Sequence, residues 1–337
     1  MRRKPEFGRR EPVLRFMLLL AALVGTLALL LVGGRWLESR SRKPEARGDY
    51  QQRYEYDENI VVNGETYRRR RDVAAILLMG IDRDSNAEVI GYRNGGQADF
   101  LQLMAIDDAN ERITRILIDR DTMTPITVLG VLGNQSGVRT AQICLSHGFG
   151  DGGAQSCELT ADAVSNLLLG VPIDEYLSMN LDGIPVLNDA VGGVTVTLED
   201  DFTALDPAMK AGVTLTLHGK QAAYFVRNRM NIGIGTNEAR MERQQMYMSS
   251  LSDLLDERVR TDQNAIGQIY DELEPYLKTS MARGYIINKA WAAHGYARDV
   301  REIAGKHCIG SDGFMEFHAD EAFIEALVLE LFYQKVK

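Results

Sequence analysis

The sequence lacks the short motifs that identify several large enzyme classes. In its 337 residues there is no GxxxxGK[ST] loop, no GxGxxG turn directly after a predicted strand and no GxSxG nucleophile elbow. The five histidines are scattered, and no Ser-His-Asp set can be assembled from their spacing. A P-loop nucleotidase, a dinucleotide-dependent enzyme and a covalent hydrolase are therefore not indicated.

Cysteine is scarce, with three in the chain, and none has the CxxC or HxxxH spacing that is typical of zinc sites. Cys144 and Cys157 lie thirteen residues apart across a glycine-rich loop. A disulfide between them would suit an oxidising compartment outside the cytoplasm. Two buried free thiols are an alternative of nearly equal weight, and Cys308 is left over in either case.

Positive charge is scarce after the first 50 residues, where 27 Lys and Arg face 42 Asp and Glu. This balance disfavours nucleic acid as a partner. Against it stands a group of four arginines within seventeen residues: Arg227, Arg229, Arg240 and Arg243. The guanidinium fork matches phosphate oxygens two at a time, so the cluster favours a site for a phosphorylated group. Ion pairs with nearby carboxylates on a solvated helix are the alternative for each of them.

One long hydrophobic run is present, over Phe16–Gly34, with nineteen residues and no charge. It is long enough to span a bilayer as a helix, and the basic residues before it are typical of a cytoplasmic flank. We expect a cytoplasmic tail over 1–15, a transmembrane signal-anchor over 16–34 and an extracytoplasmic tether over 35–72. A cleaved signal peptide is disfavoured because no small-x-small site follows the run.

The remaining pattern alternates short apolar runs with amphipathic stretches. We expect strands at Ile60–Val62, Ala74–Ile81, Phe100–Ile106, Ile113–Ile118, Tyr176–Asn180 and Val194–Leu198. We expect helices at Thr140–Ser146, Thr160–Leu169, Gly183–Ala190, Gly219–Val226, Glu238–Asp256 and Asp320–Tyr333. This order predicts an α/β domain over 73–260, with a mixed central β-sheet covered by helices on both faces. Residues 261–337 are expected to form a helical extension that packs on the domain or continues it.

Two aspartates stand at the ends of predicted strands. Asp82 directly follows the first long strand, and Asp99 opens the second. If these strands are antiparallel neighbours, both carboxylates lie at the same sheet edge, where they can hold Mg²⁺. Taken singly, each aspartate is more often a turn or capping residue.

Further charged residues can join this edge. Arg120 lies between Asp119 and Asp121 at the end of the third strand, either in a self-contained ion-pair group or directed into a cleft beyond the strand ends. Arg240 and Arg243 are three residues apart on a predicted helix. Gln244 is four residues after Arg240, so all three residues lie on one face of the helix.

Eight segments, taken in order, resemble the LytR-CpsA-Psr family. They cover about residues 73–255 and follow one N-terminal anchor of the kind that the family carries. The segments are Leu77–Asp82, Ala98–Phe100, Ile118–Thr122, Gly170–Tyr176, Asp189–Val194, Leu217–Ala222, Val226–Arg229 and Arg240–Gln245. No single segment is specific, but eight in register make chance agreement improbable.

The resemblance implies a single-pass membrane protein whose bulk is extracytoplasmic. It implies a phosphotransferase that moves a glycopolymer from a polyprenyl-pyrophosphate carrier to peptidoglycan and forms a phosphodiester. Asp82 and Asp99 correspond to the aspartates associated with Mg²⁺ (or Mn²⁺). The group that faces the pyrophosphate corresponds to Arg120, Arg227, Arg229, Arg240, Arg243 and Gln244. Of these, Arg120, Arg227 and Arg229 are expected to act in catalysis, and Asp121 or one of the metal-associated aspartates is a candidate general base.

The chain departs from the family pattern at several positions. Gln97 stands where the family often has an arginine, and Arg93 in the preceding loop is a candidate to replace it. Arg139 occupies the place of a common lysine and joins the expected pyrophosphate-binding set. Asp119 replaces a common proline, and Asn237 stands where an aspartate is frequent.

Two further readings of the chain stay open. It is either a non-catalytic envelope regulator that binds polyprenyl pyrophosphate, or a hydrolase that cleaves the lipid pyrophosphate. Whether the chain is a transferase, a regulator or a hydrolase, the lipid tail needs an apolar groove. The helices predicted around 157–169 and 183–191 are candidates to line it, although core packing is the alternative for most of their residues.

Overall fold

A computed structural model describes residues 59–83, 95–228, 232–233, 235–262 and 264–336. The predicted cytoplasmic tail, the transmembrane segment and most of the tether lie outside these ranges. Within the part of the chain that the structure describes, no helix is both long and apolar enough to cross a membrane. Residues 56–337 form one compact unit, and the fold is that of this unit.

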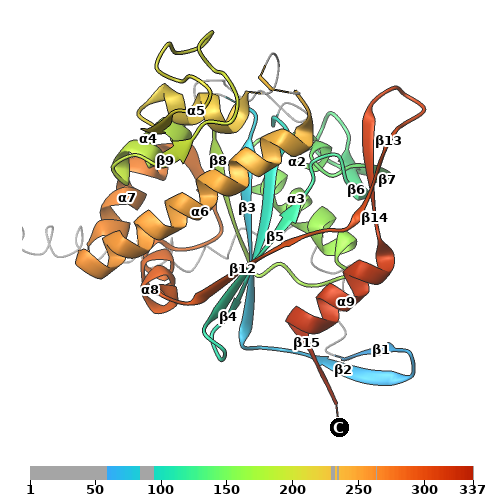
Figure 1. The fold of residues 1–337 in the computed structure, drawn as a ribbon. Helices are drawn as coiled ribbons and strands as arrows, with labels where there is room; N and C mark the ends of the chain where they lie inside the picture. The colour runs from blue at the N-terminus through green and yellow to red at the C-terminus, as the bar shows by residue number, and fades with distance from the viewer. Residues whose placement is uncertain (1–58, 84–94, 229–231, 234, 263, 337) are drawn as a thin grey trace, which may run out of the picture. The chain divides into compact units, whose positions relative to one another are not determined.

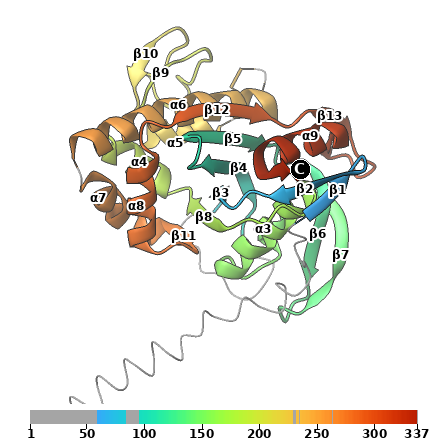
Figure 2. The same cartoon turned by 90° about the horizontal axis from the view of Figure 1, so that it is seen from below.

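The centre of the fold is a six-stranded mixed β-sheet (Figures 1 and 2). In order across the sheet, its strands are β11 (Leu277–Thr279), β8 (Glu175–Asn180), β3 (Val73–Ile81), β4 (Ala98–Asp107), β5 (Arg112–Ile118) and β12 (Ala297–Glu302). The pairs β3–β8 and β5–β12 are parallel, whereas β3–β4, β4–β5 and β11–β8 are antiparallel.

Strand β3 is central and nearly all apolar, as is typical of a strand with both faces covered. Leu77 belongs to a core on one face, and its neighbour Ile76 to a separate apolar cluster on the other. Alternate side chains of a strand point to opposite faces, so one run of small and branched residues serves two cores.

Helices cover both faces of the sheet. Helices α3 (Ala154–Leu167) and α9 (Glu321–Phe332) pack on the core that contains Leu77 and Leu103. The helices of the other face are α4 (Gly183–Ala190), α5 (Lys220–Arg227), α6 (Asn237–Thr261), α7 (Ala265–Leu273) and α8 (Arg283–Ala293). Figure 1 shows α6 as the long helix that runs beside α5 and α7. The predicted mixed sheet with helices on both faces is confirmed.

Smaller elements surround the sheet. Strands β1 (Asn59–Val62), β2 (Glu65–Arg69) and β15 (Tyr333–Lys335) form a three-stranded sheet, so the predicted pairing segment at Ile60–Val62 is confirmed. The two-stranded sheets pair β6 (Met123–Leu129) with β7 (Gln135–Gln142), β9 (Thr195–Thr197) with β10 (Thr214–Thr216), and β13 (Gly305–Ile309) with β14 (Met315–Ala319). The short helices are α2 (Leu145–Gly148) and the 3₁₀ turn η2 (Glu274–Tyr276).

Three expectations about local structure are wrong. Residues 59–69, placed in the tether, form β1 and β2, and β2 pairs with the C-terminal strand β15, so this segment belongs to the folded unit. Residues 261–337 are not purely helical, because β11 and β12 form the two edges of the central sheet. The helix expected at Thr140–Ser146 is the end of strand β7 followed by the single turn α2.

Candidate active site

Asp82 and Asp99 lie at the same end of two neighbouring strands, β3 and β4, in the central sheet. Strands β3 and β4 are antiparallel, Ile81 pairs with Ala98, and the register shifts between Gly80 and Ile81. The N–H of Asp82 donates to the carbonyl of Gln97 over 2.8 Å, which continues the pairing past the end of the strand. The predicted convergence of the two strand ends that carry Asp82 and Asp99 is therefore confirmed.

Two arginines from different elements bind Asp99. Arg120 follows β5, the strand beside β4, and donates from Nη1 to Asp99 Oδ1. Arg240, in the first turns of α6, lies with Nη1 3.3 Å from Asp99 Oδ2. The N-cap Thr236 fixes the start of this helix by accepting a hydrogen bond from the Ala239 N–H.

Arg120 is held in a polar cluster. Its Nη2 donates to Gln97 and contacts Cys144 Sγ at 3.3 Å, and its Nε lies 3.4 Å from Asp121 Oδ1. Burial lowers the pKa of Arg120, but the neighbouring Cys144, Asp99 and Asp121 outweigh it, so that the net shift of the pKa is upward. Arg120 therefore stays charged, and it is directed toward Asp99 rather than locked between Asp119 and Asp121.

Arg227 pairs with Asp82. It is the last residue of α5, and its Nη2 lies 3.3 Å from Asp82 Oδ1. The Arg227 side chain is 55% exposed and that of Asp82 45%. Both groups are thus open to a ligand from solvent, unlike Arg240, whose side chain is 5% exposed.

A cavity of about 360 Å³ opens beside these pairs. Its charged and amide lining is contributed by Asp82, Asp99, Asn180, Arg227, Arg240 and Gln244. Nearly all of its remaining lining is apolar, from strands β3 and β8 and from helices α4, α6, α7 and α8. One cavity therefore joins a charged region to an apolar wall, which suits a ligand with an anionic head and a hydrocarbon tail.

Helix α6 supplies one side of this cavity. Its lining residues are Arg240, Gln244, Tyr247, Met248, Leu251 and Leu255. They recur every three or four positions and so form one stripe of the helix, polar at the start and apolar beyond. At 1.5 Å per residue the stripe extends about 22 Å. The cavity can thus accommodate an extended apolar chain of several isoprene-sized units.

The helices predicted to line an apolar groove have different positions. Ile184 and Leu187 of α4 line the cavity, which agrees with the prediction for 183–191. Helix α3 does not, because its residues Val164 and Leu167 pack in the core on the opposite face of the sheet. For 157–169 the alternative of core packing is therefore the one that is confirmed. The stripe on α6 has helical periodicity and could have been found in the sequence.

Arg243 and Gln244 bind the protein itself. Arg243 is buried, pairs with Asp200 at 2.9 Å and donates from Nε to the carbonyl of Phe225 over 3.1 Å. Gln244 donates to the carbonyl of Val226 over 3.0 Å. Both residues donate to backbone carbonyls in the last turn of α5, which have no hydrogen-bond partner within the helix. Gln244 lines the cavity, whereas Arg243 does not; Arg243 contacts the protein itself and positions the segment that carries Arg227.

The remaining predicted anion-binding residues are not brought together with these. Arg139 is exposed on β7, lies 5.2 Å from the ring centre of Phe149 and does not line the cavity. The structure therefore does not bring Arg139 together with the residues that line the cavity. Arg93 and Arg229 lie outside the described residues.

Asp119 is the centre of a second network that the sequence did not predict. Its buried carboxylate accepts hydrogen bonds from Asn237 Nδ2 and from the Asp121 N–H, at 2.9 and 2.8 Å. His307 Nε2 lies 2.9 Å from Asp119 Oδ2, and His307 Nδ1 lies 3.3 Å from Glu238. The network ties the segment after β5 to the start of α6 and to β13. Asn237, noted in the sequence only as a departure, also accepts from Arg240 at 2.7 Å.

Cys144 and Cys157 are free thiols, which contradicts the disulfide candidate. The two residues serve different contacts: Cys144 faces Arg120, whereas Cys157 on α3 lies 3.3 Å from the Ser178 hydroxyl on β8. Burial raises the pKa of each thiol to about 12, and for Cys144 the nearby Arg120 only partly opposes this shift. Both thiols are therefore protonated and are not nucleophiles.

A sequence model of the LytR_cpsA_psr family matches residues 37–307. The chain is 28% identical over 207 residues to a polyisoprenyl-teichoic acid–peptidoglycan teichoic acid transferase, TagU, of Halalkalibacterium halodurans, covering 57% of this chain and 62% of that protein. To the Bacillus subtilis protein of the same name it is 22% identical over 333 residues, covering 96% and 97%.

A solved structure shares the fold. The Streptococcus agalactiae protein gbs0355 superposes with a TM-score of 0.63 at 20% sequence identity, over 77% of this chain and 86% of that one. At this identity the likeness concerns the architecture, including the mixed central sheet. What the site does chemically has to be argued from its own residues.

Proposed function

This chain belongs to the LytR-CpsA-Psr family, and from that premise we propose that it is a membrane-anchored, extracytoplasmic phosphotransferase. It moves a glycopolymer from a polyprenyl-pyrophosphate carrier to peptidoglycan and forms a phosphodiester link. The names of the related transferases support the reaction class. The observation that carries the proposal for this chain is the cavity whose charged region, with Asp99 and Arg227, continues into an apolar wall along α6.

The charged region fits a diphosphate. Arg227 and Arg240 line the cavity, and Arg120 binds Asp99 from outside that lining; the three arginines come from separate segments and converge on Asp82 and Asp99. In the proposed complex the arginines exchange their carboxylate partners for phosphate oxygens. Fixed guanidinium groups stabilise the charge that develops on the leaving phosphate, without reorganisation during the reaction.

The two aspartates suit a divalent ion, Mg²⁺ or Mn²⁺. Both carboxylates line the cavity and come from adjoining strand ends, and hard cations prefer such oxygen donors. When bound with the diphosphate, the ion would supply charge neutralisation on the phosphate oxygens. Arg120 and Arg240, released from Asp99, would then be free to hold the phosphates. Arg227 does the same from the half-exposed side of the site.

The transfer needs a base for the acceptor hydroxyl. The hydroxyl oxygen of the wall sugar attacks the phosphorus that bears the glycopolymer, the bond to the bridging oxygen breaks, and polyprenyl phosphate leaves. The hydroxyl proton passes to a carboxylate, for which Asp121 is our candidate because its Oδ1 lies 3.4 Å from Arg120 Nε. Asp121 is then a proton acceptor and Arg120 the group that orients it.

A turnover assay tests the function. The full chain in detergent, with Mg²⁺, a polyprenyl-pyrophosphate-linked glycopolymer and peptidoglycan, should release polyprenyl phosphate and yield polymer-bearing wall. Arg227→Ala should reduce turnover at least a hundredfold, as removal of one transition-state donor does elsewhere. Arg260→Ala is the matched control, because Arg260 lies at the far end of α6 in an exposed pair with Glu257.

Three results would redirect the assignment. Full turnover by Arg227→Ala would remove the diphosphate role from this residue. Tight lipid binding without any product would favour an envelope regulator. Release of polyprenyl phosphate without transfer to the wall would favour a lipid pyrophosphate hydrolase.

A further inference from the structure

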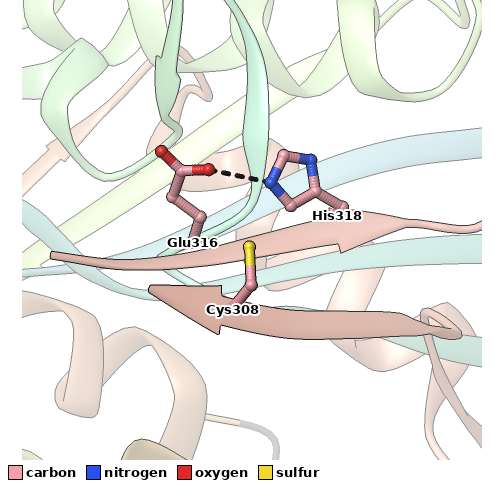
Figure 3. A group of neighbouring side chains, drawn as sticks. All are labelled: Cys308, Glu316 and His318. Carbon is pink, nitrogen blue, oxygen red and sulfur yellow. Dashed lines mark hydrogen bonds and ion pairs between the residues drawn. The ribbon is translucent and has the colours of Figure 1, made fainter. Parts of the chain in front are cut away.

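A second cluster of reactive side chains lies on the β13–β14 hairpin. Cys308 on β13 pairs directly with Glu316 on β14 in the antiparallel register. His318 follows Glu316 by two residues and so points to the same face of the hairpin. Figure 3 shows the three side chains together on one side of the two strands.

The donor atoms of this cluster lie close together. One ligand atom from each of Cys308, Glu316 and His318 lies within 4.8 Å of the other two. His318 Nε2 is 2.8 Å from Glu316 Oε2. Cys308 and His318 are exposed and Glu316 is partly buried, so a solvated ion can reach all three.

We propose that Cys308, Glu316 and His318 bind a divalent transition-metal ion of the Zn²⁺ type. Zinc takes thiolate, imidazole and carboxylate ligands at about 2.0–2.3 Å, most often in a tetrahedron. Tetrahedral angles place such donors about 3.3–3.7 Å apart, so that closing the site needs shifts of about 1 Å or less from each side chain. Water supplies the fourth ligand. A thiolate and an imidazole select this class of ion over Mg²⁺.

The ion would act as a clip across the hairpin. Strands β13 and β14 form a sheet of two strands, and such a sheet is marginally stable by itself. The metal ion would join one ligand on β13 to two ligands on β14. Because this arrangement exists only in the folded hairpin, the free energy of metal binding stabilises the hairpin. The spacing of these ligands in the sequence, with seven residues between Cys308 and Glu316, matches no common zinc motif, which is why the sequence did not predict the site.

The opposite face of the hairpin reaches the active site. His307, next to Cys308, lies 2.9 Å from the buried Asp119. The Phe317 N–H, between the other two ligands, donates to the carbonyl of Asp121 over 2.8 Å. A metal on the outer face would therefore hold in place the two strands that fix the segment with Arg120. This site is separate from the proposed Mg²⁺ site at Asp82 and Asp99.

Cobalt titration of the full chain in detergent tests the proposal. Co²⁺ bound by a thiolate gives a charge-transfer absorption in the near ultraviolet, and we expect one equivalent to produce it. Cys308→Ser should abolish the band, and His318→Gln should weaken Co²⁺ binding at least tenfold. Zn²⁺ should displace the cobalt, whereas millimolar Mg²⁺ should not. His218→Gln, which removes an exposed histidine elsewhere, should change neither the band nor the affinity.

Further measurements separate a site from adventitious binding. Amide hydrogen exchange of 305–319 should slow with Zn²⁺ in the native chain but not in Cys308→Ser, with equal circular dichroism for both. The proposal is overturned if no charge-transfer band forms, if the band survives in Cys308→Ser, or if His318→Gln and His218→Gln bind cobalt equally well. Because the readout is metal binding and not transfer, it is independent of the proposed enzyme activity.

Discussion

Asn237 Nδ2 donates a hydrogen bond of 2.9 Å to Asp119 Oδ1. These are two of the positions at which the sequence departs from the LytR-CpsA-Psr pattern, with Asp119 for a proline and Asn237 for an aspartate. The structure brings them into contact, so the extra negative charge at 119 meets a neutral amide donor. The charge balance that each substitution alone would disturb is therefore restored within the pair.

This pairing predicts the effect of Asn237→Asp. The variant places a second carboxylate 2.9 Å from the buried Asp119, and like charges at that distance cannot both be ionised without cost. We expect a loss of about 1–3 kcal/mol of unfolding free energy at neutral pH, reduced by acidification. Urea denaturation measures it. The double variant Asp119→Asn with Asn237→Asp should be more stable than Asn237→Asp alone. Additive losses in this cycle would contradict the coupling.

Arg243 and Arg227 should differ in what their loss does to stability. Removing Arg243 leaves Asp200 and the carbonyls of Phe225 and Asn228 without their donor. Breaking such a buried pair costs about 3 kcal/mol, so Arg243→Ala should unfold at clearly lower denaturant. Arg227→Ala, which breaks a half-exposed pair, should change stability by less than about 1 kcal/mol.

Comparison of stability with turnover completes this test. Arg227→Ala should be a stable and inactive protein, whereas Arg243→Ala should lose activity only to the extent that it loses folded protein or displaces Arg227. Equal destabilisation by both substitutions would mean that Arg227 has a structural role and that its assignment to the ligand is mistaken.

His147 predicts a pH dependence of stability. Burial lowers the pKa of His147 to about 4, while its Nδ1 lies 3.1 Å from the Gly96 carbonyl. Because the unfolded chain takes up the proton near pH 6.5 and the folded one near pH 4, stability falls as the pH drops through this window. The loss is on the order of 3 kcal/mol and is complete below pH 4.

The variant His147→Gln isolates this contribution from that of the carboxylates. Urea denaturation at pH 7.5, 5.5 and 4.5 should give a smaller decrease for the variant than for the native chain. If the unfolding free energy decreases equally with pH in the two proteins, protonation of His147 does not contribute to the pH dependence of stability.

The apolar wall predicts a dependence on lipid length. Met248 lines the cavity from the middle of the α6 stripe, so Met248→Trp should fill space that the tail would occupy. We expect at least tenfold weaker binding of a long polyprenyl pyrophosphate by fluorescence titration. Binding of inorganic pyrophosphate by the same variant serves as the control and should be unchanged. Equal affinity for the long lipid would place its tail outside the cavity.

Part of this site could be predicted from sequence, since it depends on neighbours in one sheet. Asp82 and Asp99 flank a hairpin-like pair of apolar strands, and antiparallel pairing alone brings them together. Arg240 and Arg243 show the limit. The two arginines are three residues apart on one face of α6, and the sequence does not distinguish them. Yet Arg240 contacts Asp99, whereas Arg243 is held by Asp200 and the end of α5. The packing partner of each side chain is a property of the tertiary structure.

The C-terminal strands could not be predicted for a related reason. Strand β12 carries Arg298, Asp299 and Arg301, a charged pattern that does not indicate a sheet strand. Its parallel pairing with β5 is accompanied by ion pairs that join distant segments, such as Arg298 with Asp256 on α6. The sequence pattern contains only local periodicity, whereas these strands are selected by long-range pairing.

A crystal structure of the chain with a polyprenyl pyrophosphate and Mg²⁺ tests the central claim most directly. The account predicts the diphosphate between Arg120, Arg227 and Arg240, the ion on Asp82 and Asp99, and the tail along the α6 stripe toward Leu255. Density for the lipid on another face, with Arg120 and Arg240 still bound to Asp99, would contradict it.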